Sequence, residues 1–161
     1  MILRRLASIL FVSVVSLALF QGAVAEDEAV VPDQEKSIAQ ELGVEGPTET
    51  HGIESSEILG FIGLGEDFEA LWGRSLRARR VTVAAGGVVG VHQHTARPGV
   101  LYMLEGELTE VRNDANDPIT RGKGDTSFEK GGVIHWWRND SGKTAIALVV
   151  DIVPDDLTRP R

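Results

Sequence analysis

Three of the four histidines in the chain have the spacing of a metal site. His92 and His94 form a His-x-His pair at the end of a β-rich run, Val88–Val91. On a strand, residues two apart point to the same face, so the two imidazoles should lie side by side. His135 falls on a second β-rich run and completes a face of three nitrogens if the sheet folds back. Such a face can bind one divalent metal ion. The alternative is a hydrogen-bonded histidine pair on the rim of a barrel.

The composition narrows the chemistry further. The 161 residues contain no cysteine, which excludes disulfides, thiolate metal sites and a cysteine nucleophile. Any metal must therefore be held by histidine or a carboxylate. The net charge of −8 argues against a nucleic-acid partner, because binding to a phosphate backbone needs a basic face. The fourth histidine, His51, lies among polar residues and is expected to be solvated.

Short β-rich runs separated by turn residues predict an all-β sandwich or barrel from about Ser55 onward. The expected strands are Glu57–Leu64, Leu76–Ala84, Val88–His94, Val100–Leu104, Glu107–Arg112, Thr126–Glu129, Val133–Arg138 and Thr144–Val153. The continuous apolar run 145–150 is expected to be buried on both faces. The break in alternation at Arg79-Arg80 is expected to mark a β-bulge.

The first 25 residues have the order of a secretory signal peptide. Arg4 and Arg5 precede an apolar run, 6–20, and a small-x-small site ends at Ala25. The run is shorter than the roughly 20 residues of a membrane span, and an uncleaved anchor is the alternative. Cleavage after Ala25 would leave 136 residues in the periplasm or outside the cell, with no stable membrane span. Losing the two arginines would change the net charge from −8 to −10.

The mature chain is expected to have two parts. Residues 26–53 form an acidic extension, a surface arm or linker, with one short helix over Asp33–Leu42 capped by Asp33. Ile38, Ala39 and Leu42 would share one side of that helix. Residues 54–161 form the β-barrel domain with a short C-terminal tail.

The spacing around the three histidines resembles the two motifs of the cupin family. The first motif reads, in order along this chain, Gly86, then five residues, His92, Gln93, His94 and later Gly106. The second reads Gly124, then five residues, Lys130, Gly131, Gly132, two residues, His135, three residues and Asn139. The resemblance covers roughly residues 54–153. It implies a double-stranded β-helix, the jelly-roll barrel of cupins, with the histidines pointing into its mouth.

Two positions depart from the family pattern. Lys130 stands where the second motif has proline, at a turn position. Gly99 stands where the first motif has glutamate, the usual fourth metal ligand of the family. Glu105 and Glu107 are close in sequence but flank the Gly106 turn, so they are expected to be surface charges.

The resemblance therefore implies a metal site of three histidines, His92, His94 and His135, as in cupin dioxygenases that lack the glutamate. The metal would be one divalent ion, Fe, Mn, Zn, Ni or Cu, because imidazole suits all of these. Three neutral ligands leave its full charge available to an anionic small molecule. The alternative is a degenerate site at which the loss of the glutamate weakens or abolishes metal binding.

Three neighbouring residues are candidates for contacting that small molecule. Arg97 follows His94 in a loop at the expected mouth and can pair with an acid; the alternative is a solvated arginine. Tyr102 and Trp137 lie close to the histidine runs, where the alternative is barrel core. Trp137 shares the face of His135, since it lies two residues further along the same strand.

Two classes of function remain open at this stage. One is a metal-dependent oxidoreductase of dioxygenase type, in which no residue stands out as a general base. The other is a non-catalytic module that binds a small ligand or a metal. The sequence itself does not give the oligomeric state. The resemblance implies a homodimer, since cupins are often dimers, with the Leu76–Ala84 region as a candidate edge contact.

Overall fold

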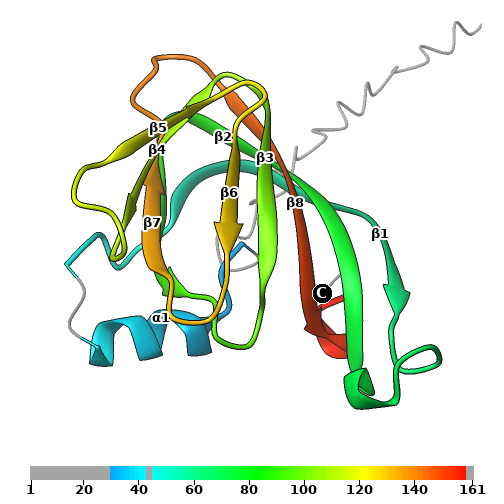
Figure 1. The fold of residues 1–161 in the computed structure, drawn as a ribbon. Helices are drawn as coiled ribbons and strands as arrows, with labels where there is room; N and C mark the ends of the chain where they lie inside the picture. Colours follow the sequence, from blue (N-terminus) through cyan, green and yellow to red (C-terminus); the bar gives the residue numbers. More distant parts are fainter. Residues whose placement is uncertain (1–29, 43–44, 159–161) are drawn as a thin grey trace, which may run out of the picture.

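The computed structural model describes residues 30–42 and 45–158, and it confirms the all-β prediction (Figure 1). Its elements are, in chain order, α1 Asp33–Glu41, β1 His51–Gly63, the 3₁₀ turn η2 Glu69–Leu71, β2 Arg74–Gln93, β3 Gly99–Glu105, β4 Glu107–Arg112, β5 Ile119–Gly122, β6 Thr126–Glu129, β7 Ile134–Arg138, β8 Ala145–Pro154 and the 3₁₀ turn η3 Asp155–Thr158.

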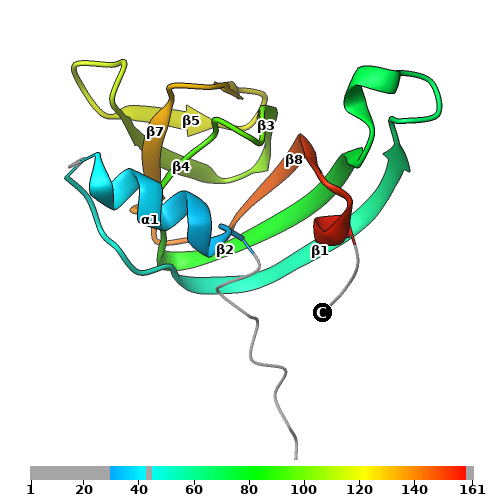
Figure 2. The ribbon, with the colours of Figure 1, turned by 90° about the horizontal axis from the view of Figure 1, so that it is seen from below.

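The strands form one antiparallel sheet that curls into a nearly closed jelly-roll barrel. The strand order is β5-β4-β7-β2-β8-β3-β6, and β1 pairs with β2 outside this path. The long strand β2 runs alongside β8 in one half and β7 in the other, and Figures 1 and 2 show its strong curvature beside β1. This bend brings His92 of β2 opposite His135 of β7. The predicted folding back of the sheet therefore occurs.

The side chains at every second position of the strands point inward and fill the barrel interior. Strands β2 and β8 alternate between buried and less buried residues along most of their length, as a barrel wall does. The main core cluster is Val30, Val31, Ile53, Val81, Val83, Val89, Leu101, Met103, Leu108, Trp137, Ala145, Ala147 and Val149. Each fully buried large apolar side chain contributes about 1.5–3 kcal/mol to folding.

Four strand-level expectations differ from the structure. The runs predicted as two strands around the Gly86-Gly87 turn are one strand, β2, and the short strand β5 was not predicted. β2 pairs with β8 without a break from Arg74 to Val83, so β2 itself has no bulge at Arg79; the register shift at this point lies in β1, between Ile58 and Gly60, opposite Arg79 and Ala78. Arg79 simply points inward, where an apolar side chain was expected. The run 145–150 is buried only at alternate positions, not on both faces.

The segment expected to be a surface arm packs against the barrel instead. Val30 and Val31 belong to the core, and α1 lies across one end of the barrel in Figure 2. Ala39 of α1 packs with Val91 and Ile134. Helix α1 matches the predicted short helix, but Pro32 precedes it as N-cap and Leu42 is exposed. The two buried residues of α1 are Glu35 and Ala39, so the helix turns a charged side chain toward the barrel.

The predicted signal peptide, residues 1–25, lies outside the described residues, and the domain boundaries at 25 and 53 remain predictions. Within residues 30–42 and 45–158, no helix has the length and apolar character needed to cross a membrane.

Candidate metal centre

The three predicted ligands converge inside the barrel. The Nε2 atom of His135 lies 2.9 Å from Nε2 of His94 and 3.1 Å from Nε2 of His92. All three side chains are buried, at 4%, 1% and 0% exposure for His92, His94 and His135. Two ligand atoms bound at about 2.1 Å to one metal ion lie roughly 3 to 3.4 Å apart. The two distances from His135 are therefore close to those that a bound metal requires, and all three ligand atoms lie within 4.8 Å of one another.

The other ring nitrogen of each histidine has a hydrogen-bond partner. Nδ1 of His92 lies 2.8 Å from the carbonyl oxygen of Gly90, and Nδ1 of His94 lies 3.0 Å from that of Arg97. A carbonyl oxygen only accepts, so both Nδ1 atoms carry the proton and donate it. Nδ1 of His135 lies 2.8 Å from Oε1 of Glu110. Partners of this kind fix the ring orientation of histidines that bind metals.

Burial keeps His92 and His94 uncharged. Desolvation, helped by the neighbouring imidazoles, lowers the pKa of His92 well below its ordinary value. Desolvation and the charge of Arg97 lower the pKa of His94 to about 2. At neutral pH both residues therefore present an Nε2 lone pair toward His135. Lone pairs that converge without a proton between them repel one another, and a cation placed among them removes that repulsion.

Glu110 is the buried anion behind His135. It is fully buried on β4, and its oxygens also accept hydrogen bonds from Ser127, Arg112 and Arg121. Burial alone would raise the pKa of Glu110, but the hydrogen bond and charge of His135, together with these donors, lower it to about 2. Sequence reasoning missed Glu110, although it shares the inward face of β4 with Leu108, two positions earlier.

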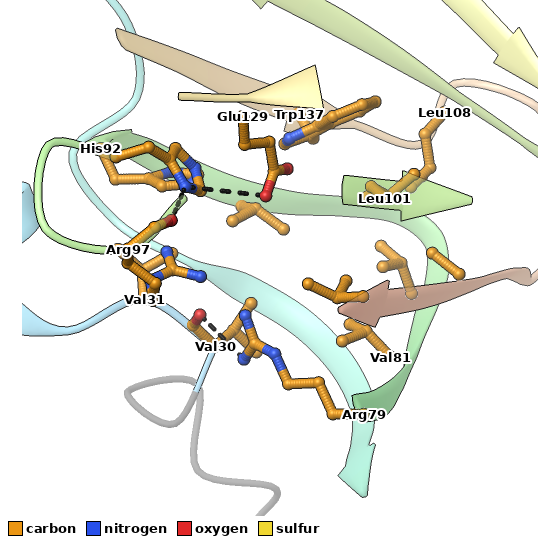
Figure 3. A pocket seen from close by; sticks show the side chains of 15 residues that line it. Val30, Val31, Arg79, Val81, His92, Arg97, Leu101, Leu108, Glu129 and Trp137 are labelled. Atoms are coloured by element: carbon orange, nitrogen blue, oxygen red, sulfur yellow. Dashed lines mark hydrogen bonds and ion pairs between the residues drawn. The ribbon is translucent and has the colours of Figure 1, made fainter. Parts of the chain in front are cut away.

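Glu129 is a second carboxylate that sequence reasoning missed. Its side chain, at the end of β6, is only 4% exposed and points toward the histidines (Figure 3). Oε2 lies 3.6 Å from Nδ1 of His94, and Oε1 lies 3.9 Å from Nε2 of His135. Burial raises the pKa of Glu129, against the opposing charges of His135 and Arg97. No residue stands out as a general base from the sequence, and the structure places this carboxylate beside the histidines.

A cavity of about 40 Å³ adjoins the histidines. It has room for on the order of three water molecules. One end is polar, formed by Arg79, His92, His94, Arg97 and Glu129; the other is apolar, formed mainly by valine, leucine and Trp137 side chains (Figure 3). Val30 and Val31, from the segment before α1, form part of its wall.

Arg97 lines this cavity but is not solvated. Its guanidinium donates to both oxygens of Glu35, at 2.9 and 2.6 Å, and to Asp151 at 3.0 Å. Burial opposes its charge, yet the hydrogen bonds and charges of Glu35 and Asp151 raise the pKa of Arg97 above its ordinary value. Asp151 also accepts two hydrogen bonds from Arg77, at 3.1 and 2.8 Å. An acidic ligand would therefore compete with Glu35 for Arg97.

The other two predicted contact residues separate. Trp137 is 3% exposed, lines the cavity and lies edge-on to His135, with ring centroids 5.5 Å apart. Tyr102 is not among the cavity-lining residues and is 42% exposed. The physical reason is alternation on β3, where Leu101 and Met103 point inward and Tyr102 outward.

The departures from the motifs have structural explanations. Lys130 opens a turn closed by the Val133 amide and the Lys130 carbonyl, at 3.0 Å, in which Gly132 has a φ of +87°. Such a turn needs glycine at its third position, not proline at its first. Glu105, Glu107 and His51 are exposed, as predicted. Asn139 is buried and donates to the carbonyls of Val83 and Lys143, so it ties the loop before β8 to strand β2.

Comparison with known families agrees with this geometry. The model of the family described as cupin domain matches residues 79–151, from the inward arginine of β2 to Asp151 of β8. Residues 79–151 of the chain therefore form a cupin domain. The matched range includes all three histidines, Gly99 and Glu129.

Similarity to individual proteins is more limited. Germin-like protein 8-14 of Oryza sativa subsp. japonica is 30% identical over 86 residues, which cover 51% of this cupin and 40% of the relative. KdgF from Halomonas sp. is similar in fold, with a TM-score of 0.51 and 17% identity over 66% of this cupin and 84% of that chain. The cupin domain of Schizosaccharomyces pombe Cnp3 has a TM-score of 0.44 and 16% identity, over 51% of this cupin and 58% of that chain.

Proposed function

We propose that this cupin binds one divalent metal ion through Nε2 of His92, His94 and His135. The convergence of the three Nε2 atoms, with every Nδ1 hydrogen-bonded elsewhere, is the observation that carries the proposal. Iron, manganese, zinc, nickel and copper all fit an imidazole site, so the ligand set leaves the metal open.

We further propose that the metal binds a small anionic molecule and that the chain is an oxidoreductase of dioxygenase type. The metal would polarise the bound anion as a Lewis acid. The protein's own part is to orient and enclose. Glu110 and two backbone carbonyls hold the three rings, Trp137 forms one wall, and Val30 and Val31 exclude water. The cavity of about 40 Å³ restricts the ligand to a few non-hydrogen atoms unless the segment before α1 moves.

A non-catalytic module is the second candidate, and the small cavity specifically favours it. Glu35 and Asp151 already neutralise Arg97, so its charge is not available to bind the acid group of a substrate. A functional enzyme of the proposed type would consume O₂ when metal-loaded protein meets a panel of small carboxylates and enediols. A module would bind without consuming O₂, which an oxygen electrode distinguishes.

Replacing His92 with alanine tests the ligand set. We expect His92→Ala to lower metal content to background while the far-ultraviolet circular dichroism of the barrel stays unchanged. His51→Ala is the matched control, because His51 is exposed at the start of β1 and should leave metal content at the wild-type level. Equal metal content in His92→Ala and wild-type protein would rule out this ligand set.

Export and dimerisation are part of the same proposal. The charged, apolar, small-residue order of residues 1–25 supports export, and the mature N-terminus should then be Glu26 by N-terminal sequencing.

The dimer contact expected at Leu76–Ala84 is wrong, because β2 has β1 on one side and β8 on the other. The exposed apolar side chains on and beside the edge strand β1 support a contact there: Leu59, Phe61, Ile62, Phe68 and Trp72. A monomer in sedimentation equilibrium would contradict the dimer.

A further inference from the structure

The position of the missing motif glutamate has no room for any side chain. A Cβ atom built on Gly99 would lie 2.8 Å from the carbonyl oxygen of Val150 and 2.9 Å from Cβ of Asp151. Both neighbours belong to β8, which pairs directly with β3 at this point. Contacts this short do not occur for real Cβ atoms, and a backbone carbonyl cannot move aside cheaply. The absence of a carboxylate at position 99 is therefore fixed by the packing of β8.

The register of the sheet places another carboxylate beside Gly99. Gly99 of β3 is the cross-strand partner of Glu129 of β6. Glu129 points to the interior, as does Ser127 two residues before it, and both are buried. A glutamate is thus present next to the motif position, carried by the neighbouring strand. Figure 3 shows its carboxylate directed toward the histidine rings.

The distances allow Glu129 to reach a metal held by the histidines. Its Oε1 lies 3.9 Å from Nε2 of His135, whereas two ligands of one metal ion lie about 3 to 3.4 Å apart. A shift of less than about 1 Å closes the difference, which a change in side-chain torsions provides. The carboxylate also lines the same cavity as His92 and His94.

The charges around the site favour a carboxylate ligand. Three neutral imidazoles leave a divalent ion with its full charge, and the cations Arg79 and Arg97 line the same cavity. Bringing a metal ion close to two buried arginines is unfavourable unless an anion lies between them. Asp151 and Glu35 already neutralise Arg97 on its far side. Glu129 is the carboxylate on the histidine side.

We propose that Glu129 replaces the missing motif glutamate and completes a metal centre of three histidines and one carboxylate from a different strand. This inference rests on the proposed metal binding. It also changes the expected chemistry of that site, because the bound metal would carry one unit less positive charge. An anionic ligand would then bind more weakly than at a site of three histidines alone.

The test compares Glu129→Gln with wild-type protein, using Mn²⁺ and Co²⁺ as probes. Glutamine keeps the shape of glutamate and removes its charge. We expect a dissociation constant for Mn²⁺ at least about tenfold higher in isothermal titration calorimetry, since even residues behind metal ligands change affinity by 10- to 100-fold. We also expect a changed visible spectrum of the Co²⁺ form. Glu105→Gln is the matched control, because Glu105 is exposed and should change neither quantity.

The outcomes separate this inference from the proposed function. If wild-type protein binds Mn²⁺ and Glu129→Gln binds it equally tightly with the same Co²⁺ spectrum, the inference is overturned and the three-histidine site stands. If wild-type protein binds no metal at all, both fail. A crystal structure of Mn²⁺-loaded wild-type protein gives the answer should the variant not fold. A Glu129 oxygen bonded to the metal supports the inference. A Glu129 carboxylate with no bond to the metal overturns it.

Discussion

Asp151 is the carboxylate on which three buried arginines converge. Arg77 and Arg97 bind its oxygens at 2.8 and 3.0 Å, and Arg79 approaches to 3.8 Å. Burial alone would raise the pKa of Asp151, but the hydrogen bonds and charge of Arg77 and the charge of Arg79 lower it. Desolvation and the neighbouring cations lower the pKa of Arg79 to about 9. Asp151 is therefore the counterion that these three arginines share.

We predict that Asp151→Asn lowers the free energy of unfolding by about 3–5 kcal/mol, because it leaves buried arginines without their counterion. Urea denaturation at neutral pH measures this change. Asp140→Asn is the control, because Asp140 pairs with Arg138 at the surface, where both side chains are well exposed. Its loss should stay within about 1 kcal/mol. Equal losses in the two variants would contradict the buried network.

The lowered pKa of Asp151 fixes how its contribution to the stability of the fold changes with pH. Asp151 has a lower pKa in the folded than in the unfolded protein, so its contribution to stability is fully present above the unfolded value, about 3.9. That contribution is lost as the pH falls through the lower folded value. Asp151→Asn should therefore remove part of the acid sensitivity that wild-type protein shows below about pH 4.

At the scale of elements, α1 is attached to the barrel by a charge pair as well as by apolar contact. Glu35 is 6% exposed, binds Arg97 through both oxygens, and lies one helical turn before Ala39 on the same face. The loop that carries Arg97 also supplies the carbonyl that orients His94. Helix α1, the Arg97 loop and one histidine ring therefore form a continuous set of contacts.

We predict that Glu35→Gln loosens α1 before it affects the barrel. Hydrogen–deuterium exchange of residues 33–41 should be faster by at least about tenfold, which corresponds to about 1.4 kcal/mol of local stability. The strands should exchange at wild-type rates. Asp33→Asn is the matched control, because Asp33 pairs with Lys36 at the surface. Unchanged exchange in Glu35→Gln would show that apolar packing alone holds the helix.

The same elements show what the sequence could predict. Alternation and turn residues located most of the strands, and motif spacing located three histidines that meet in space, because both signals are local. The alternation of inward and outward side chains also places Glu110 inside the barrel and Tyr102 outside it, but only once the inward face of each strand is known. Glu129 and Glu35 could not be found this way. Their partners are distant in sequence, and only the β3–β6 register and the docking of α1 bring them to the site.

At the scale of the whole molecule, α1 lies across one end of the barrel (Figure 2), and its Ala39 packs with Val91 and Ile134, the chain neighbours of His92 and His135. A ligand that binds only the folded state stabilises it by about 2.7 kcal/mol at a concentration 100 times its dissociation constant. Under the proposed function, metal binding would therefore stabilise the barrel. A strong chelator should lower the unfolding temperature of metal-loaded protein but leave that of His92→Ala unchanged.

Elemental analysis of the mature protein shows whether this barrel binds a metal ion. The protein should be made without a histidine tag, incubated with Fe²⁺, Mn²⁺, Zn²⁺, Ni²⁺ or Cu²⁺ in turn, and freed of unbound ions. We expect about one equivalent of at least one of these metals per chain. Background metal content with all five would contradict it.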